Sequence, residues 1–229
     1  MERLHNDFVL NTPPGTFPLS TDTMILSDFV RLPKSAKVLD LGSGCGTLGL
    51  LLCAKDSGCH ITGVELDETS HRAALENIYA NALDQRMKSI CADLRSVSQF
   101  LPKGSFTTCV SNPPYFSGGF VSQSLPLARQ NECCSIDDLM AAASCGLQFG
   151  GDFFLVQKPE NLAQLCACAC KYTMEPKRLR LVRHRSSGDI SMVLLQCRKG
   201  AKPGLIIEEL TLFNENGAPT EDYRKIYHL

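Results

Sequence analysis

Short runs of apolar and β-branched residues alternate along the chain with longer stretches of helical periodicity. Strands are expected at 37–41, 60–65, 87–91, 106–111 and 152–157, and helices at 46–54, 68–81 and 135–147. Asp67 and Ser135 occupy N-cap positions for the second and third of these helices. Strands that alternate with helices are typical of a parallel sheet with helices on both faces. The pattern therefore predicts an α/β fold.

The pattern changes in the last third of the chain. Apolar runs at 178–182 and 190–196 are joined by a turn that contains Gly188, which indicates a β-hairpin. We therefore expect a mostly parallel, seven-stranded sheet with an antiparallel hairpin at one edge. The chain contains no internal repeat, so a single domain is predicted, with an N-terminal extension (1–36), a core (37–200) and a C-terminal extension (201–229).

The composition agrees with an ordinary globular protein. Hydrophobic residues make up 44% of the 229 residues and charged residues 21%. The longest apolar run, 48–54, is far shorter than the roughly 20 residues of a membrane-spanning helix. The first 30 residues lack the pattern of a secretory signal. We therefore expect a cytoplasmic protein that does not associate with a membrane.

The twelve cysteines include no C-x-x-C pair, and the five histidines are not spaced as zinc ligands. No metal is therefore expected. The alternating residues Cys166, Cys168 and Cys170 are interpreted as small apolar side chains on a helix, where three such positions do not converge on one ligand. A redox role for this cluster, or for Cys45, remains an open alternative.

The net charge of −1 conceals an uneven distribution of charge. Segment 171–202 holds nine Lys and Arg residues against two acidic ones. A concentrated basic segment in a neutral protein suggests contact with a polyanion. The alternative is that these side chains only solvate the outer faces of strands. The residues that would contact phosphates are Lys177, Arg178, Arg180, Arg183 and Arg185.

A glycine-rich segment, D-L-G-S-G-C-G at 40–46, lies where the first strand gives way to its helix. Glycines allow a ligand to approach the backbone, and the helix N-terminus offers unpaired N–H groups. The pattern G-x-G-x-x-G at 44–49 also matches the dinucleotide fingerprint, with Glu65 as the ribose ligand. However, the Asp40 carboxylate suits a cationic amine better than a pyrophosphate. A purely structural loop is the third interpretation.

The tetrapeptide Asn112-Pro113-Pro114-Tyr115 follows the strand at 106–111. Two prolines fix φ twice and remove two backbone donors, so this segment is stiff and rich in acceptors. The Asn112 side-chain oxygen and the Pro113 carbonyl can each accept one N–H of a planar amino group. Tyr115 offers a ring on which a base can stack, worth roughly 1–3 kcal/mol per base. The alternative is a proline-stiffened turn with a surface tyrosine.

Together, the glycine turn and N-P-P-Y resemble the active site of class I S-adenosylmethionine-dependent methyltransferases that act on adenine N6, cytosine N4 or glutamine N5. The resemblance implies a Rossmann-like fold with S-adenosylmethionine as cofactor. It places Glu65 at the ribose, Asp93 at the adenine amino group, and the four residues of N-P-P-Y at the transferred methyl group. The implied cofactor site comprises Thr21, Asp40, Gly42, Gly44, Gly46, Glu65, Leu66, Asp93, Leu94 and Asn112.

Over its whole length the chain resembles the bacterial tRNA1(Val) (adenine-N6)-methyltransferase family. The triplet S-T-D at 20–22 stands where that family has a G-T-D-like triplet ahead of a helix, here at 23–30. Segment 128–132 resembles its A-R-x-E stretch with one extra residue before the glutamate, and Y-R-K-I-Y at 223–227 resembles its closing segment. Ser20 replaces the glycine of the triplet. Arg129 becomes a further candidate for RNA binding.

This resemblance implies methyl transfer to the N6 amine of an adenine in tRNA, with residues 1–36 helping to form the site. Four alternatives remain at this point: another RNA base as acceptor, a protein glutamine, a non-catalytic RNA-binding protein, and a nicotinamide-dependent oxidoreductase. The chain could act as a monomer or as a homodimer.

Overall fold

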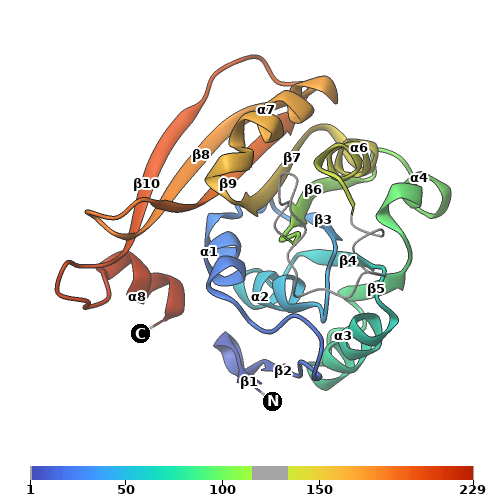
Figure 1. Cartoon of the computed structure of the whole chain (residues 1–229). Coiled ribbons are helices and arrows are strands. Elements are labelled where there is room, and N and C mark those ends of the chain that lie inside the picture. The colour runs from blue at the N-terminus through green and yellow to red at the C-terminus, as the bar shows by residue number, and fades with distance from the viewer. Residues whose placement is uncertain (1, 115–133, 229) are drawn as a thin grey trace.

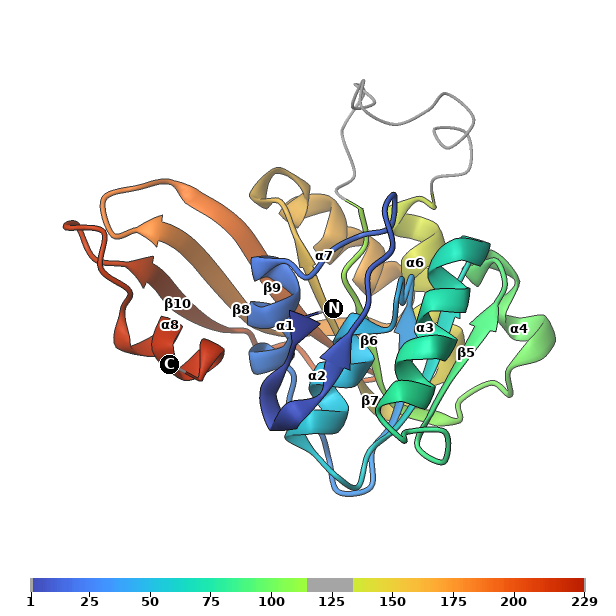
Figure 2. The same cartoon turned by 90° about the horizontal axis from the view of Figure 1, so that it is seen from below.

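The computed structural model describes residues 2–114 and 134–228 of the chain. Its main element is an eight-stranded sheet in the order β10-β8-β9-β7-β6-β3-β4-β5 (Figures 1 and 2). The strands are β3 (Lys37–Leu41), β4 (His60–Glu65), β5 (Met87–Cys91), β6 (Phe106–Ser111), β7 (Leu147–Gln157), β8 (Met174–Arg185), β9 (Ile190–Lys199) and β10 (Ile206–Phe213). Only β9 runs antiparallel to its neighbours, β7 and β8. The predicted α/β class, mostly parallel with an edge hairpin, is confirmed.

Helices cover both faces of this sheet (Figure 1). The elements are α1 (Thr21–Phe29), α2 (Thr47–Lys55), α3 (Glu68–Ala80) and α8 (Glu221–Tyr227) on one face, and α4 (Val97–Phe100), α6 (Ile136–Gly146) and α7 (Leu162–Lys171) on the other. Short 3-10 turns lie at η1 (His5–Asp7), η2 (Leu94–Ser96) and η3 (Pro159–Asn161), and β1 (Glu2–Arg3) pairs with β2 (Val9–Leu10) beside α2 and α3. Among the helices of the described residues, none is long and apolar enough to cross a membrane.

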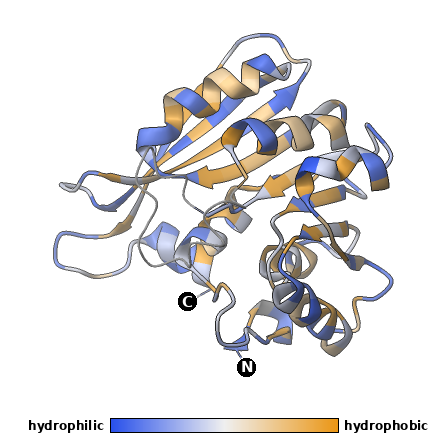
Figure 3. Cartoon of the chain, turned by 45° about the vertical axis from the view of Figure 1, so that its right-hand side comes forward, coloured by the Kyte–Doolittle hydropathy of each residue, from blue (hydrophilic) through white to orange (hydrophobic). Residues whose placement is uncertain are grey.

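Two apolar cores lie between the sheet and its helix layers (Figure 3). Successive side chains of a strand point to opposite faces, so neighbouring residues of β7 enter different cores. Phe154 meets Phe29 of α1 edge to face, with ring centroids 5.9 Å apart. Phe153 belongs to the core under α6 and α7. Apolar strand residues thus attach α1 firmly to the middle of the sheet.

Helix caps lie where the sequence places them. Asp67 accepts a hydrogen bond from the Ser70 backbone N–H at 2.8 Å, and Ser135 forms a reciprocal capping box with Asp138. These short-range bonds fix the starts of α3 and α6. The predicted caps are therefore confirmed.

The sheet has one strand more than the seven predicted. β10 lies in the segment predicted as a C-terminal extension and pairs in parallel with β8. Its two adjacent glutamates interrupt the apolar alternation, yet Glu208 is held by Arg180 of β8 at 2.6 Å. β7 also begins at Leu147 rather than at 152, because it continues through the two glycines at 150–151 with a register shift against β6. Strand pairing here overrides the local turn signal.

Candidate functional site

Four neighbouring strands bring the predicted site residues to one edge of the sheet. β6, β3, β4 and β5 are adjacent and parallel, so their carboxyl ends lie side by side. Asp40 pairs with Gly63 on one side and with Val110 on the other. Loops that follow such strand ends form the ligand-binding crevice of open α/β sheets. The glycine turn, Glu65, Asp93 and Asn112 therefore lie at the edge of the sheet where such a crevice forms.

The glycine turn adopts a backbone that favours glycine at three positions. Gly42, Gly44 and Gly46 have φ of 72°, 54° and 81°. A Cβ on Gly42 or Gly44 would meet no atom within 4 Å, whereas one on Gly46 would lie 2.8 Å from the Met87 side chain. The first two glycines thus face open space, and Gly46 packs against the protein. The turn has the open surface that a ligand needs.

A buried carboxylate lies beneath this turn. Asp40 is 1% exposed, and its Oδ2 is one of the few buried side-chain atoms of the described residues that have no hydrogen-bond partner. Burial, and secondarily the charge of Glu65, raises the pKa of Asp40 to about 7. A cationic amine would supply the missing partner, and a pyrophosphate would be repelled. The residues present therefore fit the amino-acid end of S-adenosylmethionine better than a dinucleotide.

Glu65 closes the turn at the end of β4. One carboxylate oxygen accepts the Gly44 N–H and the other accepts the Asp67 N–H, each at 2.8 Å. These bonds hold the carboxylate at the turn while lone pairs remain for hydroxyl groups. Leu66, the next residue, is 47% exposed.

Asp93 follows β5 and caps η2. Its carboxylate accepts the Arg95 backbone N–H and the Arg95 Nε–H, both at 2.8 Å. The hydrogen bond from the Arg95 side chain lowers the pKa of Asp93, so the carboxylate stays ionised. Leu94 lies half-buried beside it. An adenine amino group would have to share Asp93 with Arg95, a competition that the sequence did not indicate.

Asn112 stands at the end of β6 with its amide held from one side. Its Nδ2 donates to Thr23 Oγ1 of α1 at 2.8 Å, and Pro113 behind it is buried. Ser111 Oγ donates to the Leu41 carbonyl at 2.7 Å, which ties the end of β6 to the end of β3. Pro114 is exposed. The predicted residues Tyr115 and Arg129 lie outside the described residues.

Two asparagines that the sequence analysis did not single out hold the N-terminal segment against α3. Asn77 is 1% exposed; its Oδ1 accepts the Asn11 N–H, and its Nδ2 donates to the carbonyls of Asn11 and Cys45. One turn later, Asn81 forms the same pair of bonds with Val9. The bond to Cys45 reaches the glycine turn itself. The only sequence signal was the four-residue spacing of the two asparagines on one helix.

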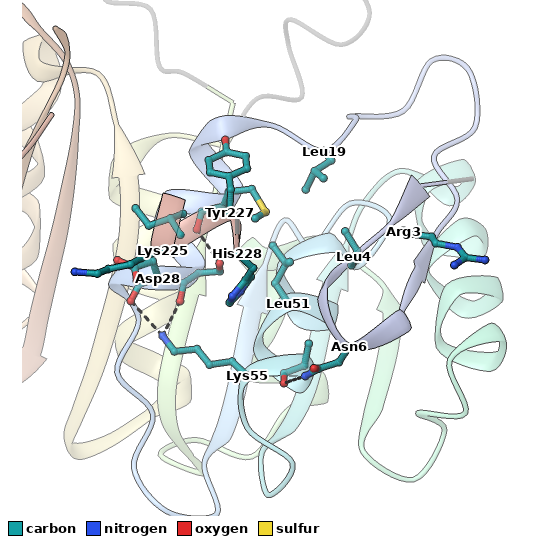
Figure 4. Close-up of a pocket in the computed structure, with 14 residues that line it drawn as sticks. Arg3, Leu4, Asn6, Leu19, Asp28, Leu51, Lys55, Lys225, Tyr227 and His228 are labelled. Carbon is teal, nitrogen blue, oxygen red and sulfur yellow. Dashed lines mark hydrogen bonds between the residues drawn. The ribbon is translucent and has the colours of Figure 1, made fainter. Parts of the chain in front are cut away.

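Thr21 is exposed at the first turn of α1 and lies near Tyr227 of α8. Tyr227 stacks on Tyr223 with ring centroids 4.2 Å apart. On this side of α1 the structure has a cavity of about 690 Å³ (Figure 4), lined by the N-terminal hairpin, α1, α2 and α8. The two similar threonines of α1 thus have different surroundings: Thr21 meets the C-terminal helix, and Thr23 meets Asn112.

The basic segment is largely engaged within the protein. The Arg178 side chain is 5% exposed and donates to the Phe29 carbonyl, and Arg180 forms ion pairs with Asp28 and Glu208. Neither guanidinium is available to an RNA phosphate in this arrangement. The charge count did not indicate these internal partners, because both residues lie within β8 rather than at its end.

The other basic candidates lie nearer to solvent. Lys177 is half-buried and donates to the Lys202 carbonyl. Arg183 donates to the Gly188 carbonyl at 2.7 Å and lies 3.9 Å from Glu209. Arg185 is exposed at the end of β8, near Glu215.

The chain is similar to known proteins in both sequence and fold. Residues 19–165 match the family model of the methyltransferase small domain. A tRNA1(Val) (adenine(37)-N6)-methyltransferase of Shewanella sp. (strain MR-4) is 30% identical over 89% of this chain and 87% of its own. The enzyme of the same name from Photobacterium profundum is 26% identical over 87% of this chain and 85% of its own. The crystal structure of a predicted O-methyltransferase from Agrobacterium tumefaciens has a TM-score of 0.76, 21% identity, and covers 91% of this chain and 96% of its own.

Proposed function

The chain belongs to the family of the methyltransferase small domain, and on that basis we propose that it transfers a methyl group from S-adenosylmethionine to the N6 amine of an adenine in tRNA. The observation that carries the proposal is the placement of Asn112. Its amide nitrogen is occupied by Thr23, which leaves Oδ1 and the Pro113 carbonyl as acceptors beside the glycine turn.

In the proposed site, each residue would contact a different part of the cofactor. Asp40 would meet its cationic amino group, Gly42 and Gly44 would allow close approach to the turn, and Glu65 would accept from the ribose hydroxyls. Asp93 would accept from the adenine amino group. When bound, S-adenosylmethionine supplies a methyl group on a positively charged sulfur, which keeps the bonding electrons when the methyl group is transferred.

The chain's own contribution to the chemistry is to hold the acceptor amine. Asn112 Oδ1 and the Pro113 carbonyl would accept its two N–H groups, which turns the nitrogen lone pair toward the methyl carbon. The product nitrogen carries one proton too many, and water removes it, so no general base is required. Catalysis is then positioning and electrostatic complementarity.

The tRNA would contact the edge of the sheet that carries the hairpin. Arg185 supports this part of the proposal, because it is exposed at the end of β8, the strand next to the edge strand β10; Arg183 and Lys177 are half-buried on the same strand. Recognition of a folded RNA through its shape and backbone does not require base-specific contacts from every arginine. Two relatives that match over most of this chain are named as tRNA adenine-N6 methyltransferases.

The test is transfer of labelled methyl groups from S-adenosylmethionine to bulk tRNA, to DNA and to a release-factor protein offered in parallel. We expect label in tRNA alone, and its loss in Asn112→Ala with cofactor affinity retained. Label in protein or DNA, or full activity of Asn112→Ala, would overturn the proposal.

A further inference from the structure

We propose that Thr23, hydrogen-bonded to Ser20, is a positioning residue that holds the Asn112 amide in place at the end of β6, with Nδ2 toward α1. The inference rests on the proposed function, since it concerns how the acceptor oxygen of that site is presented. Thr23 lies 89 residues before Asn112, and no motif of the sequence includes it.

The three side chains form one connected set of hydrogen bonds. Asn112 Nδ2 donates to Thr23 Oγ1 at 2.8 Å, and Thr23 Oγ1 lies 3.0 Å from Ser20 Oγ. Ser20 Oγ also accepts the Thr23 backbone N–H at 3.3 Å as the N-cap of α1. Thr23 is only 4% exposed, so water does not compete freely for these groups.

The hydrogen bond to Thr23 sets where the two ends of the Asn112 amide lie. Nδ2 faces Thr23 Oγ1, and the Thr23 hydroxyl can give its own proton to Ser20 Oγ, so each of these groups has a partner. Without the Thr23 hydroxyl, Nδ2 would lose this partner beside a buried position, which is unfavourable. In the observed arrangement Oδ1 is left for the N–H of the acceptor.

Helix α1, which carries Thr23, is held in place by hydrogen bonds and packing at its C-terminal end. There the Lys55 ammonium donates to the carbonyls of Ser27 and Asp28 at 3.0 and 3.1 Å (Figure 4). It also donates to the Val30 carbonyl at 2.8 Å. Arg178 donates to the Phe29 carbonyl at 3.1 Å. These bonds satisfy the last carbonyls of the helix, and Phe29 anchors it to β7. The helix is thus fixed at the end opposite Thr23.

The experiment compares Thr23→Val with Thr23→Ser, and with Ser27→Ala as the matched control. Ser27 carries a hydroxyl on the same helix, and this hydroxyl donates to the Met24 carbonyl of that helix. We expect Thr23→Val to lower kcat on tRNA on the order of 10- to 100-fold, with KM for the cofactor within about twofold. Thr23→Ser restores kcat to within about threefold, and Ser27→Ala leaves it unchanged. An equal kcat for Thr23→Val and wild type overturns the proposal, as does an equal loss in Thr23→Ser.

A second measurement needs neither tRNA nor cofactor. In ¹H–¹⁵N spectra the side-chain NH₂ pair of Asn112, assigned by its loss in Asn112→Asp, is expected to shift in Thr23→Val and to exchange with water at least about tenfold faster. It should not move in Ser27→Ala. An unmoved pair in Thr23→Val refutes the positioning role even if the wild-type protein methylates adenine. Conversely, if the pair shifts but the wild-type protein forms no N6-methyladenosine, the proposed function fails and the positioning inference stands.

Discussion

Asp40→Asn is expected to stabilise the protein at alkaline pH while it weakens cofactor binding. Burial raises the pKa of Asp40 from 3.8 to about 7 in the folded protein. Its folded pKa lies above its unfolded value, so ionisation costs folding free energy. This cost is absent below the unfolded pKa, grows as pH rises from about 4, and is complete above about 7.

The magnitude follows from the size of the shift. At roughly 1.4 kcal/mol per pKa unit, ionised Asp40 costs on the order of 4 kcal/mol at pH 8 and roughly 2 kcal/mol at pH 5. Asparagine keeps the shape but carries no charge. The gain in unfolding free energy from Asp40→Asn should therefore be larger at pH 8 than at pH 5, by roughly 2–3 kcal/mol.

Urea unfolding of both proteins at the two pH values measures this difference, with unchanged m-values as the check on comparable states. Calorimetric titration of S-adenosylmethionine supplies the second half of the prediction. Affinity for the wild type should fall as pH drops below about 7, because a protonated Asp40 no longer attracts an amine, and affinity for Asp40→Asn should be low at both values. If Asp40→Asn is less stable than wild type at pH 8, or its gain is the same at both pH values, the reasoning is wrong.

Three further substitutions test other parts of the site. Asn77→Ala removes the bonds to Asn11 and Cys45, so it should lower the free energy of unfolding by roughly 1–3 kcal/mol and weaken cofactor binding; unchanged melting with and without cofactor would contradict this. Arg180→Gln should lower the melting temperature without changing the salt dependence of tRNA binding, because Arg180 is paired with Asp28 and Glu208. Arg185→Gln should leave the melting temperature unchanged and reduce the slope of log K for tRNA binding against log salt by about one unit, as measured by filter binding. A loss of stability without a change in slope would show that Arg185 does not contact the RNA.

Short-range features of the site could be predicted from the sequence. The glycine turn, the carboxylates after β4 and β5, and N-P-P-Y after β6 each lie within a few residues of a strand end. Parallel pairing of β6, β3, β4 and β5 then brings those ends together without further information. The N-caps at Asp67 and Ser135 are local in the same sense.

The rest depends on partners far apart in the chain. Asn77 holds Asn11 across 66 residues, and Arg178 reaches the Phe29 carbonyl across 149. The charge of a basic residue in a strand does not show whether its side chain meets solvent or a buried carbonyl, so the internal partners of Arg178 and Arg180 could not be predicted from the charge count. β10 was missed for a related reason, since its glutamates are neutralised by arginines of β8 that only the sheet order places beside them.

The identity of the methylated nucleoside tests the central claim most directly. Bulk tRNA is incubated with the protein and S-adenosylmethionine that carries a deuterated methyl group, digested to nucleosides, and analysed by mass spectrometry against authentic standards. The account predicts deuterated N6-methyladenosine as the labelled product, and none with Asn112→Ala. Label on adenine N1, on another base or on a ribose would contradict it, because Asn112 and Pro113 would then be holding a different group from the N6 amine.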